Sequence, residues 1–265
     1  MKIGVQWNSF LPPEEGAAAL RAAGVDATML LSEIPDAREV LTVLPRYGIL
    51  CENLHAPFDG INAIWRSGEA GEEMLRRLSK ALRLAAEFSV PSVVVHLSSK
   101  TPMPQITPLG EERLDALVSL GSSLGVRVVF ENQRFLENLT WAMERFPTAG
   151  FCWDTGHEHC FTEGIEFLPR FGKRLAVLHV HDNRCLADRD EHLLPFDGAI
   201  DFEKVARQIA ATDYRDSLML EVFRSSKRNG ESIYSHLSPE AFYCEAAGRA
   251  RRLAEMVEKA RAIKT

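Results

Sequence analysis

Eight short β-rich segments alternate with longer amphipathic segments along the chain, and this alternation restricts the fold more than any other feature. The β-rich segments are residues 2–6, 27–31, 49–55, 92–96, 127–131, 150–154, 176–180 and 217–223. Such alternation predicts βα units around a parallel sheet, and the nearly continuous apolarity of the segments is typical of strands covered on both faces. Eight units in 265 residues predict an α/β fold, a closed (β/α)8 TIM barrel, with a single domain over residues 1–265.

Helix signals separate the predicted strands. Residues 68–89 carry apolar side chains at helical spacing, which predicts an amphipathic helix. Pro35 and Pro239 fit the first turn of helices, and Asp201 and Ser238 are expected to be N-caps. A doubly wound open sheet is the alternative fold. It is disfavoured because no strand is followed by a Gly-x-Gly-x-x-Gly or a Gly-x4-Gly-Lys-Ser/Thr motif.

Composition limits the classes of function. No stretch approaches the roughly 18 apolar residues of a membrane span, and the first ten residues lack the apolar region of a signal peptide, so we expect a cytoplasmic protein. The net charge of −6 gives no general attraction to nucleic acid or to an anionic membrane. The odd number of scattered cysteines favours reduced thiols over a disulfide framework.

Histidine and carboxylate side chains lie at or near the ends of most predicted strands. They are His55, His96, Glu131, Asp154, His179 and Glu221. In a (β/α)8 barrel the carboxyl ends of the strands form the active-site face. Buried charge is costly unless it is paired or bound to metal, and carboxylates from three strands would repel one another without a cation. The oxygen and imidazole donors therefore predict a divalent ion, Mn²⁺ or Zn²⁺ first and Mg²⁺ or Co²⁺ next.

The segment GFCWDTGHEHC, residues 150–160, combines several reactive side chains in one place. The spacing between Cys152 and Cys160 matches neither a structural zinc site nor a Cys-x-x-Cys redox motif. We interpret Asp154 as a ligand at a strand tip, followed by a turn that directs His157 to the same mouth. Cys152 is expected to fill the barrel interior, and the positions after His157 are expected to form a loop.

Seven segments, in chain order, resemble the sugar phosphate isomerase/epimerase branch of the xylose isomerase-like superfamily of TIM barrels. They are NLHAPF (53–58), VVVHLS (93–98), VFENQRF (129–135), CWDTGH (152–157), VLHVHDN (177–183), DEHLLPFDGAIDF (190–202) and LMLEVF (218–223). No single segment is specific, but their ordered combination is. The resemblance implies a metal-dependent barrel that acts on a small sugar.

The resemblance also implies roles for individual residues. Ketose 3-epimerases of this superfamily hold one metal ion with a Glu, an Asp, a His and a second Glu from successive strands. By motif, these ligands correspond to Glu131, Asp154, His179 and Glu221. The family implies substrate contacts for His157 and, one residue from the family position, for Arg184. His55 and His96 are expected to contact substrate at the same mouth.

The same superfamily includes apurinic endonucleases of the endonuclease IV type, which bind three zinc ions. By motif, the additional ligands of those enzymes correspond to His55, His96 and His157, together with Asp190 and His192. This resemblance makes the last two residues a candidate additional metal or phosphate site. The forms HVHDN and DEHLLP, however, are similar to the isomerases rather than to the endonucleases.

We therefore predict a metal-dependent isomerase or epimerase of a small sugar or sugar phosphate. Glu131 and Glu221 are the expected catalytic residues, one removing a proton beside a carbonyl and the other returning it through an enediolate. A zinc phosphodiesterase acting on abasic DNA is the first alternative, and a sugar-binding barrel without turnover is the second. The helix expected over 239–263 leaves a homo-oligomer open.

Overall fold

The protein is an eight-stranded parallel barrel surrounded by helices. The computed structural model describes residues 1–100, 102–162, 164–186, 189–224 and 233–263. The strands are β1 (Lys2–Val5), β2 (Ala27–Leu31), β3 (Leu50–His55), β4 (Ser92–Val95), β5 (Arg127–Glu131), β6 (Gly150–Asp154), β7 (Leu175–His179) and β8 (Ser217–Leu220). The predicted TIM barrel and all eight predicted strands are confirmed, with differences of at most three residues at the strand ends.

The strands form one sheet in the order β7-β6-β5-β4-β3-β2-β1-β8. The ring closes between β7 and β8 just beyond the strand ends. There, the Val180 amide donates to the Met219 carbonyl at 2.9 Å, and the Glu221 amide donates to the Val180 carbonyl at 3.0 Å. All the strands run in the same direction, so their carboxyl ends meet at one mouth of the barrel.

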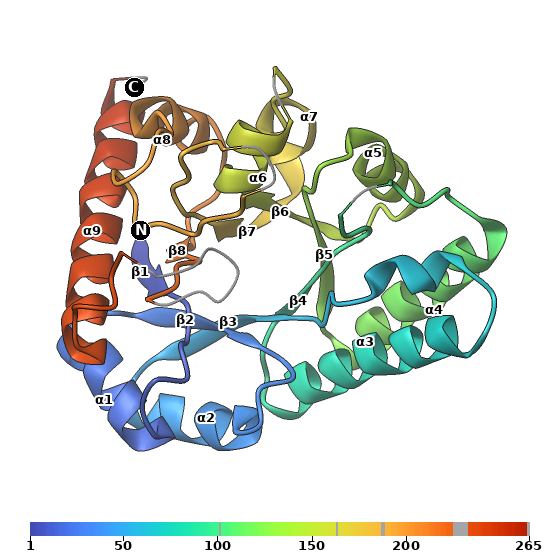
Figure 1. Ribbon diagram of the computed structural model, residues 1–265, viewed down its shortest axis with the longest axis horizontal. Coiled ribbons are helices and arrows are strands. Elements are labelled where there is room, and N and C mark those ends of the chain that lie inside the picture. The colour runs from blue at the N-terminus through green and yellow to red at the C-terminus, as the bar shows by residue number, and fades with distance from the viewer. Residues whose placement is uncertain (101, 163, 187–188, 225–232, 264–265) are drawn as a thin grey trace.

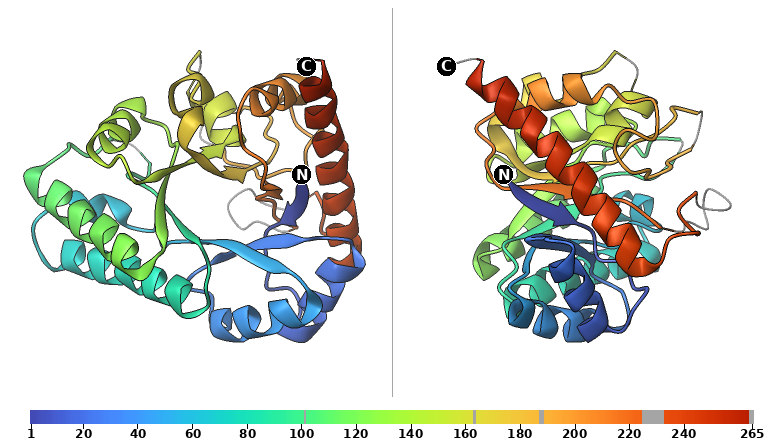
Figure 2. Two further views of the ribbon diagram at one scale, coloured as in Figure 1. Left: turned by 180° about the vertical axis from the view of Figure 1, so that it is seen from behind. Right: turned by 90° about the vertical axis from the view of Figure 1, so that its left-hand side faces the viewer.

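Helices cover the outside of the barrel (Figure 1). They are α1 (Pro13–Ala22), α2 (Ala37–Val43), α3 (Glu69–Glu87), α4 (Pro108–Leu124), α5 (Leu136–Arg145), α6 (Thr155–Phe161), α7 (Leu168–Phe171), α8 (Phe202–Ala210) and α9 (Pro239–Ala262), with 3₁₀ turns at Leu44–Tyr47, Ile61–Trp65 and Gly172–Arg174. The long helix α9 runs along one side and packs against α8 and α1 (Figure 2). No helix in the described ranges combines the length and apolarity that crossing a membrane requires.

The predicted helix signals are confirmed with one exception. The Asp201 carboxylate accepts from two backbone amides at the start of α8, and the Ser238 hydroxyl accepts from the Ala241 amide at the start of α9. Pro239 is the first residue of α9. The expectation for Pro35 is wrong because α2 begins at Ala37, and the chain around the proline forms a turn instead.

The apolar core has an outer and an inner part. The outer part lies between the strands and the helices. Inside the ring, one cluster consists of Val94, Val129, Cys152 and Val177, and another consists of Ala27, Met29 and Met219. Cys152 is fully buried there, so its expected role in filling the barrel is confirmed. This packed interior makes the barrel a rigid support for the side chains at its mouth.

Candidate metal centre

Four side chains meet at the carboxyl ends of neighbouring strands. Glu131, Asp154 and His179 are the last residues of β5, β6 and β7, and Glu221 follows β8. All four are buried, and each offers a ligand atom within 4.8 Å of those of the other three. The Nδ1 atom of His179 lies 2.5 Å from a Glu131 oxygen and 3.3 Å from a Glu221 oxygen, so it sits between the two glutamates. The structure thus brings together the four residues that the sequence predicted as ligands.

A second group shares Glu131 with the first. His55 ends β3 and His96 directly follows β4, and both imidazoles face the same carboxylate. Its Oε2 atom lies 2.5 Å from Nε2 of His96 and 3.7 Å from Nε2 of His55. The ring of Phe58 stacks on His96 at a centroid distance of 4.8 Å. An apolar wall therefore covers one side of this group.

A third group lies beside the first and includes both residues of the predicted additional site. His192 and His157 approach one oxygen of Asp190 at 3.0 and 3.4 Å. His181 offers a ligand atom within 4.8 Å of those of Asp190 and His192, and its Nε2 atom lies 3.2 Å from Asp154. The described residues therefore contain three neighbouring donor groups at one mouth.

The sequence reasoning missed two residues of this mouth. His181 follows His179 by two positions, and the alternation of an extended chain sends both side chains to the same face. That signal was present in the motif HVHDN. The second residue is Gln133, whose Nε2 atom lies 2.9 Å from Glu131, 3.1 Å from His96 and 3.3 Å from His157. Gln133 also follows a predicted ligand, Glu131, by two positions, so the same spacing was present there.

The Arg184 side chain is half exposed, and its guanidinium pairs with the buried carboxylate of Glu191, which is not a member of the three donor groups.

The chain after Asp154 forms a short helix, so the loop expected beyond His157 is wrong. The Asp154 Oδ1 atom accepts from the His157 amide at 2.6 Å and thereby caps α6. This cap stabilises the helix and fixes the position of His157. Gly156 lies in the first turn against His181, where a Cβ atom would be 1.9 Å from the imidazole Cε1. The close approach of α6 to β7 thus requires glycine.

Electrostatics at the mouth favour the ionised forms of Glu131 and Glu221. Burial alone would raise the pKa of Glu131, but His96 and His179 hold it well below its usual range. The pKa of Glu221 is lowered against the effect of burial by His179 and His192. Burial opposes charge on His179 as well, but the acidic groups around it raise its pKa well above the usual value. Protons on imidazoles therefore balance the carboxylates, and a bound cation would replace them.

The donor set fits a divalent cation. Among the described residues, the Oδ2 atom of Asp154 is buried at this mouth without a hydrogen-bond partner. Unsatisfied buried polar atoms are costly, and a metal ion satisfies them. Three carboxylates and one imidazole, without a thiolate, suit Mn²⁺, Zn²⁺, Mg²⁺ or Co²⁺.

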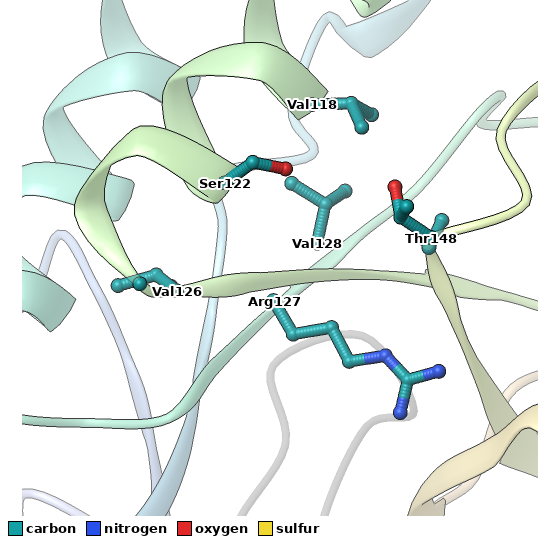
Figure 3. A pocket seen from close by; sticks show the side chains of 8 residues that line it. Val118, Ser122, Val126, Arg127, Val128 and Thr148 are labelled. Atoms are coloured by element: carbon teal, nitrogen blue, oxygen red, sulfur yellow. The ribbon is translucent and has the colours of Figure 1, made fainter.

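Two cavities in the described part lie away from this mouth. One of about 490 Å³ is lined by residues at the starts of strands, including Lys2, Leu50 and Ser92. The other, of about 240 Å³, lies between α4 and β5, and Figure 3 shows Arg127 pointing away from its other labelled side chains. Because Arg127 begins β5 and Glu131 ends it, both cavities belong to the opposite end of the barrel. The convergence of polar groups, rather than cavity size, marks the candidate site.

Comparisons with known proteins agree with this architecture. The family model described as xylose isomerase-like TIM barrel matches residues 17–256. An uncharacterised protein of Sinorhizobium fredii, y4fM, is 40% identical over 210 residues, which are 73% of this chain and 63% of that protein. The chain thus spans less than two thirds of the length of this relative.

Solved structures share the fold at low sequence identity. A 3-keto-D-glucoside 4-epimerase from E. coli is 18% identical with a TM-score of 0.73, covering 95% of this chain and 99% of its own. D-psicose 3-epimerase from Clostridium cellulolyticum is 14% identical with a TM-score of 0.75, covering 97% and 99%. The IolI protein with a bound zinc atom is 19% identical with a TM-score of 0.75, covering 98% and 99%. Fold, strand-end residues and family match together show that the chain belongs to the xylose isomerase-like TIM barrel family.

Proposed function

We propose that the protein is a metal-dependent isomerase or epimerase of a small sugar or sugar phosphate. The observation that carries this proposal is the buried group of Glu131, Asp154, His179 and Glu221 at the barrel mouth. Two sugar epimerases and a zinc-binding protein among the similar structures support the same class of activity. These four residues would hold the divalent ion, with Mn²⁺ or Zn²⁺ favoured and Mg²⁺ or Co²⁺ as alternatives.

The chemistry is proton transfer beside a carbonyl. A bound cation would polarise the carbonyl and stabilise the negative charge that develops on its oxygen. Glu131 and Glu221 extend from strands on either side of His179, so one, in its ionised form, would remove a proton from the substrate, and the other, in its protonated form, would deliver a proton to the opposite face of the enediolate. The lowered pKa of each glutamate favours the ionised form that the base requires.

The remaining polar groups would bind and orient the substrate. His55, His96 and His157 supply imidazole groups along one side of the mouth, and Gln133 contacts two of them. These groups donate or accept hydrogen bonds to hydroxyls, while the Phe58 ring covers an apolar face of a sugar. Arg184 would join them only after leaving Glu191, and it then offers a charge for a phosphate.

The test is uptake of solvent deuterium at the carbon beside the carbonyl, measured by NMR over a panel of ketoses and ketose phosphates with metal-loaded protein. We expect exchange in the wild type, and loss of at least 100-fold in Glu131→Gln and Glu221→Gln, since general base catalysis contributes about 10²–10⁴-fold. Glu255→Gln, an exposed position on α9, is the matched control and should retain full activity. Metal content is measured for each variant, so loss of the ion is distinguished from loss of the base.

Absence of exchange with every sugar, in a sample that holds its metal, would contradict the proposal and favour a sugar-binding barrel without turnover.

The three adjoining donor groups favour one second candidate, a zinc phosphodiesterase acting on abasic DNA. Glu131 is shared by two groups, and Asp190 with His192 and His181 forms the third, an arrangement suited to several ions that together activate water and bind a phosphodiester. Elemental analysis after gentle purification separates the candidates. About one ion per chain supports the isomerase, whereas about three zinc ions per chain, with cleavage of a duplex containing an abasic site, supports the phosphodiesterase.

A further inference from the structure

Two cysteines meet beside the candidate site, although they are 25 positions apart in the sequence. Cys160 lies near the end of α6, and Cys185 lies in the segment that follows β7. The Cys185 Sγ atom is 3.6 Å from the carbonyl oxygen of His159, the residue directly before Cys160. Besides burial, the Cys185 thiol also raises the pKa of Cys160, an effect that acts only between side chains that lie close together. The fold therefore brings two thiols close together, although their spacing in the sequence does not predict this.

Hydrogen bonds at the base of both segments hold this arrangement. The Thr155 hydroxyl donates to the His181 carbonyl at 2.9 Å, which fastens the start of α6 to the end of β7. The Asn183 side chain accepts from the Cys185 amide at 3.2 Å. Cys160 therefore lies five residues from one of these contacts, and Cys185 takes part in the other.

The two thiols differ in accessibility. Cys185 is exposed, whereas Cys160 is partly buried. Burial, followed by the neighbouring Cys185 thiol, raises the pKa of Cys160. A reagent in solution therefore reaches Cys185 first, and Cys160 acts in a second, slower step because less of it is thiolate at neutral pH.

We propose that Cys160 and Cys185 are a redox-modification site, which forms a reversible intramolecular disulfide on reaction with a low-molecular-weight disulfide. In the first step, the Cys185 thiolate attacks one sulfur of the reagent, forms a mixed disulfide and releases one thiol. In the second, the Cys160 thiolate attacks the Cys185 sulfur and releases the other thiol. Both protein thiols are oxidised, the reagent is reduced to two thiols, and the protons of the cysteines end on those products.

The disulfide would tie α6 to the segment after β7. Helix α6 carries His157, and the segment leads to Asp190, whose carboxylate His157 approaches at 3.4 Å. Oxidation would thus restrict the chain on both sides of the third donor group. The site concerns the thiols alone and does not depend on which reaction the mouth catalyses.

The test treats the full metal-loaded protein with oxidised glutathione, blocks the remaining thiols and maps tryptic peptides by mass spectrometry without reduction. Cleavage after Arg145 and Arg170 releases the peptide with Cys160, and cleavage after Arg184 and Arg189 releases the peptide with Cys185. We expect these two peptides to be linked, to separate on reduction, and to give the oxidised protein a higher melting temperature.

Variants assign the bond and make the result decisive. Cys160→Ser should leave a stable glutathione adduct on Cys185, which also excludes Cys152 in the same peptide as the partner. Cys244→Ser removes another exposed thiol, on α9, and should form the linked peptide as the wild type does. Two outcomes would overturn the proposal. One is a glutathione adduct on Cys185 of the wild type that is as stable as in Cys160→Ser. The other is a disulfide from Cys185 to Cys152, to Cys244 or to a second molecule.

Discussion

Replacing Gly156 by alanine tests how tightly α6 is packed on the candidate site. The added Cβ would lie 1.9 Å from Cε1 of His181, about 1.5 Å closer than ordinary van der Waals contact. The imidazole has little room to move away. It is fully buried, stacks on His192 at a centroid distance of 4.0 Å, and lies 3.2 Å from Asp154. We expect displacement of this ring to cost about 1–3 kcal/mol, as overpacking of a core does.

Helix propensity acts in the opposite direction, since alanine is favoured over glycine by about 1 kcal/mol inside a helix. The net expectation for Gly156→Ala is a loss of up to about 2 kcal/mol, or a melting temperature lower by up to about 8 °C for a chain of this size. In a His181→Ala background the ring is absent, and the same change should be neutral or stabilising. The two backgrounds should therefore differ by about 1–3 kcal/mol in a double-mutant cycle.

The assay is thermal unfolding of the four proteins, followed by circular dichroism at one metal concentration. Gly248→Ala is the matched control, because Gly248 also lies in a helix but has nothing within 4 Å of an added Cβ, and it should raise the stability. If Gly156→Ala is as stabilising as Gly248→Ala with His181 present, the close packing of α6 on β7 is refuted.

Three further outcomes follow from the site and its supports. Removal of divalent ions by a chelator should lower the melting temperature, and re-addition should restore it. For an ion present at 100 times its Kd, the expected loss in the free energy of unfolding is about 2.7 kcal/mol. An unchanged melting temperature would contradict a resident ion. In metal-free protein, burial opposes charge on His192, but Asp190 and Glu221 raise the pKa of this residue to about 9. A raised histidine pKa stabilises the fold fully below the unfolded value near pH 6.5, and this contribution is lost as pH rises through about 9. Between these pH values, the free energy of unfolding measured in urea should therefore fall more for the wild type than for His192→Gln. Trp153→Phe removes the 2.7 Å hydrogen bond from the indole to the buried Glu158 carboxylate and should lower the free energy of unfolding by about 1.5–3 kcal/mol in denaturant titration, whereas Trp141→Phe, a partly exposed indole on α5, should cost less.

The sequence predicted the barrel well because its strands are short apolar runs separated by strong helix signals. The sequence also brought together the four residues proposed as ligands, since each lies at or just beyond the end of a strand and the fold then dictates where it points. The helix α6 was missed because glycine and histidine in DTGHEHC have low helix propensity, and the cap from Asp154 that favours the helix serves the mouth at the same time.

Contacts between loops could not be predicted in the same way. Gln133, two positions beyond β5, turns into the mouth, whereas Arg184, five positions beyond β7, pairs with Glu191. The proximity of Cys160 and Cys185 likewise depends on how two connecting segments pack. Side chains on strands inherit their direction from the sheet, whereas those on loops depend on neighbours that the local sequence does not specify.

Among the described residues, one bridging pair, Val180 with Leu220, joins β7 to β8, whereas four pairs join β4 to β5, so the β7–β8 joint is a weakly paired seam of the barrel. His179 and Glu221 stand on the two sides of this seam, directly above it. An ion bound by both residues would link β7 to β8. Amide hydrogen exchange around residues 180 and 221 should therefore slow more on metal addition than exchange at the β4–β5 ladder. Separation of β7 from β8 and release of the ion would then occur together.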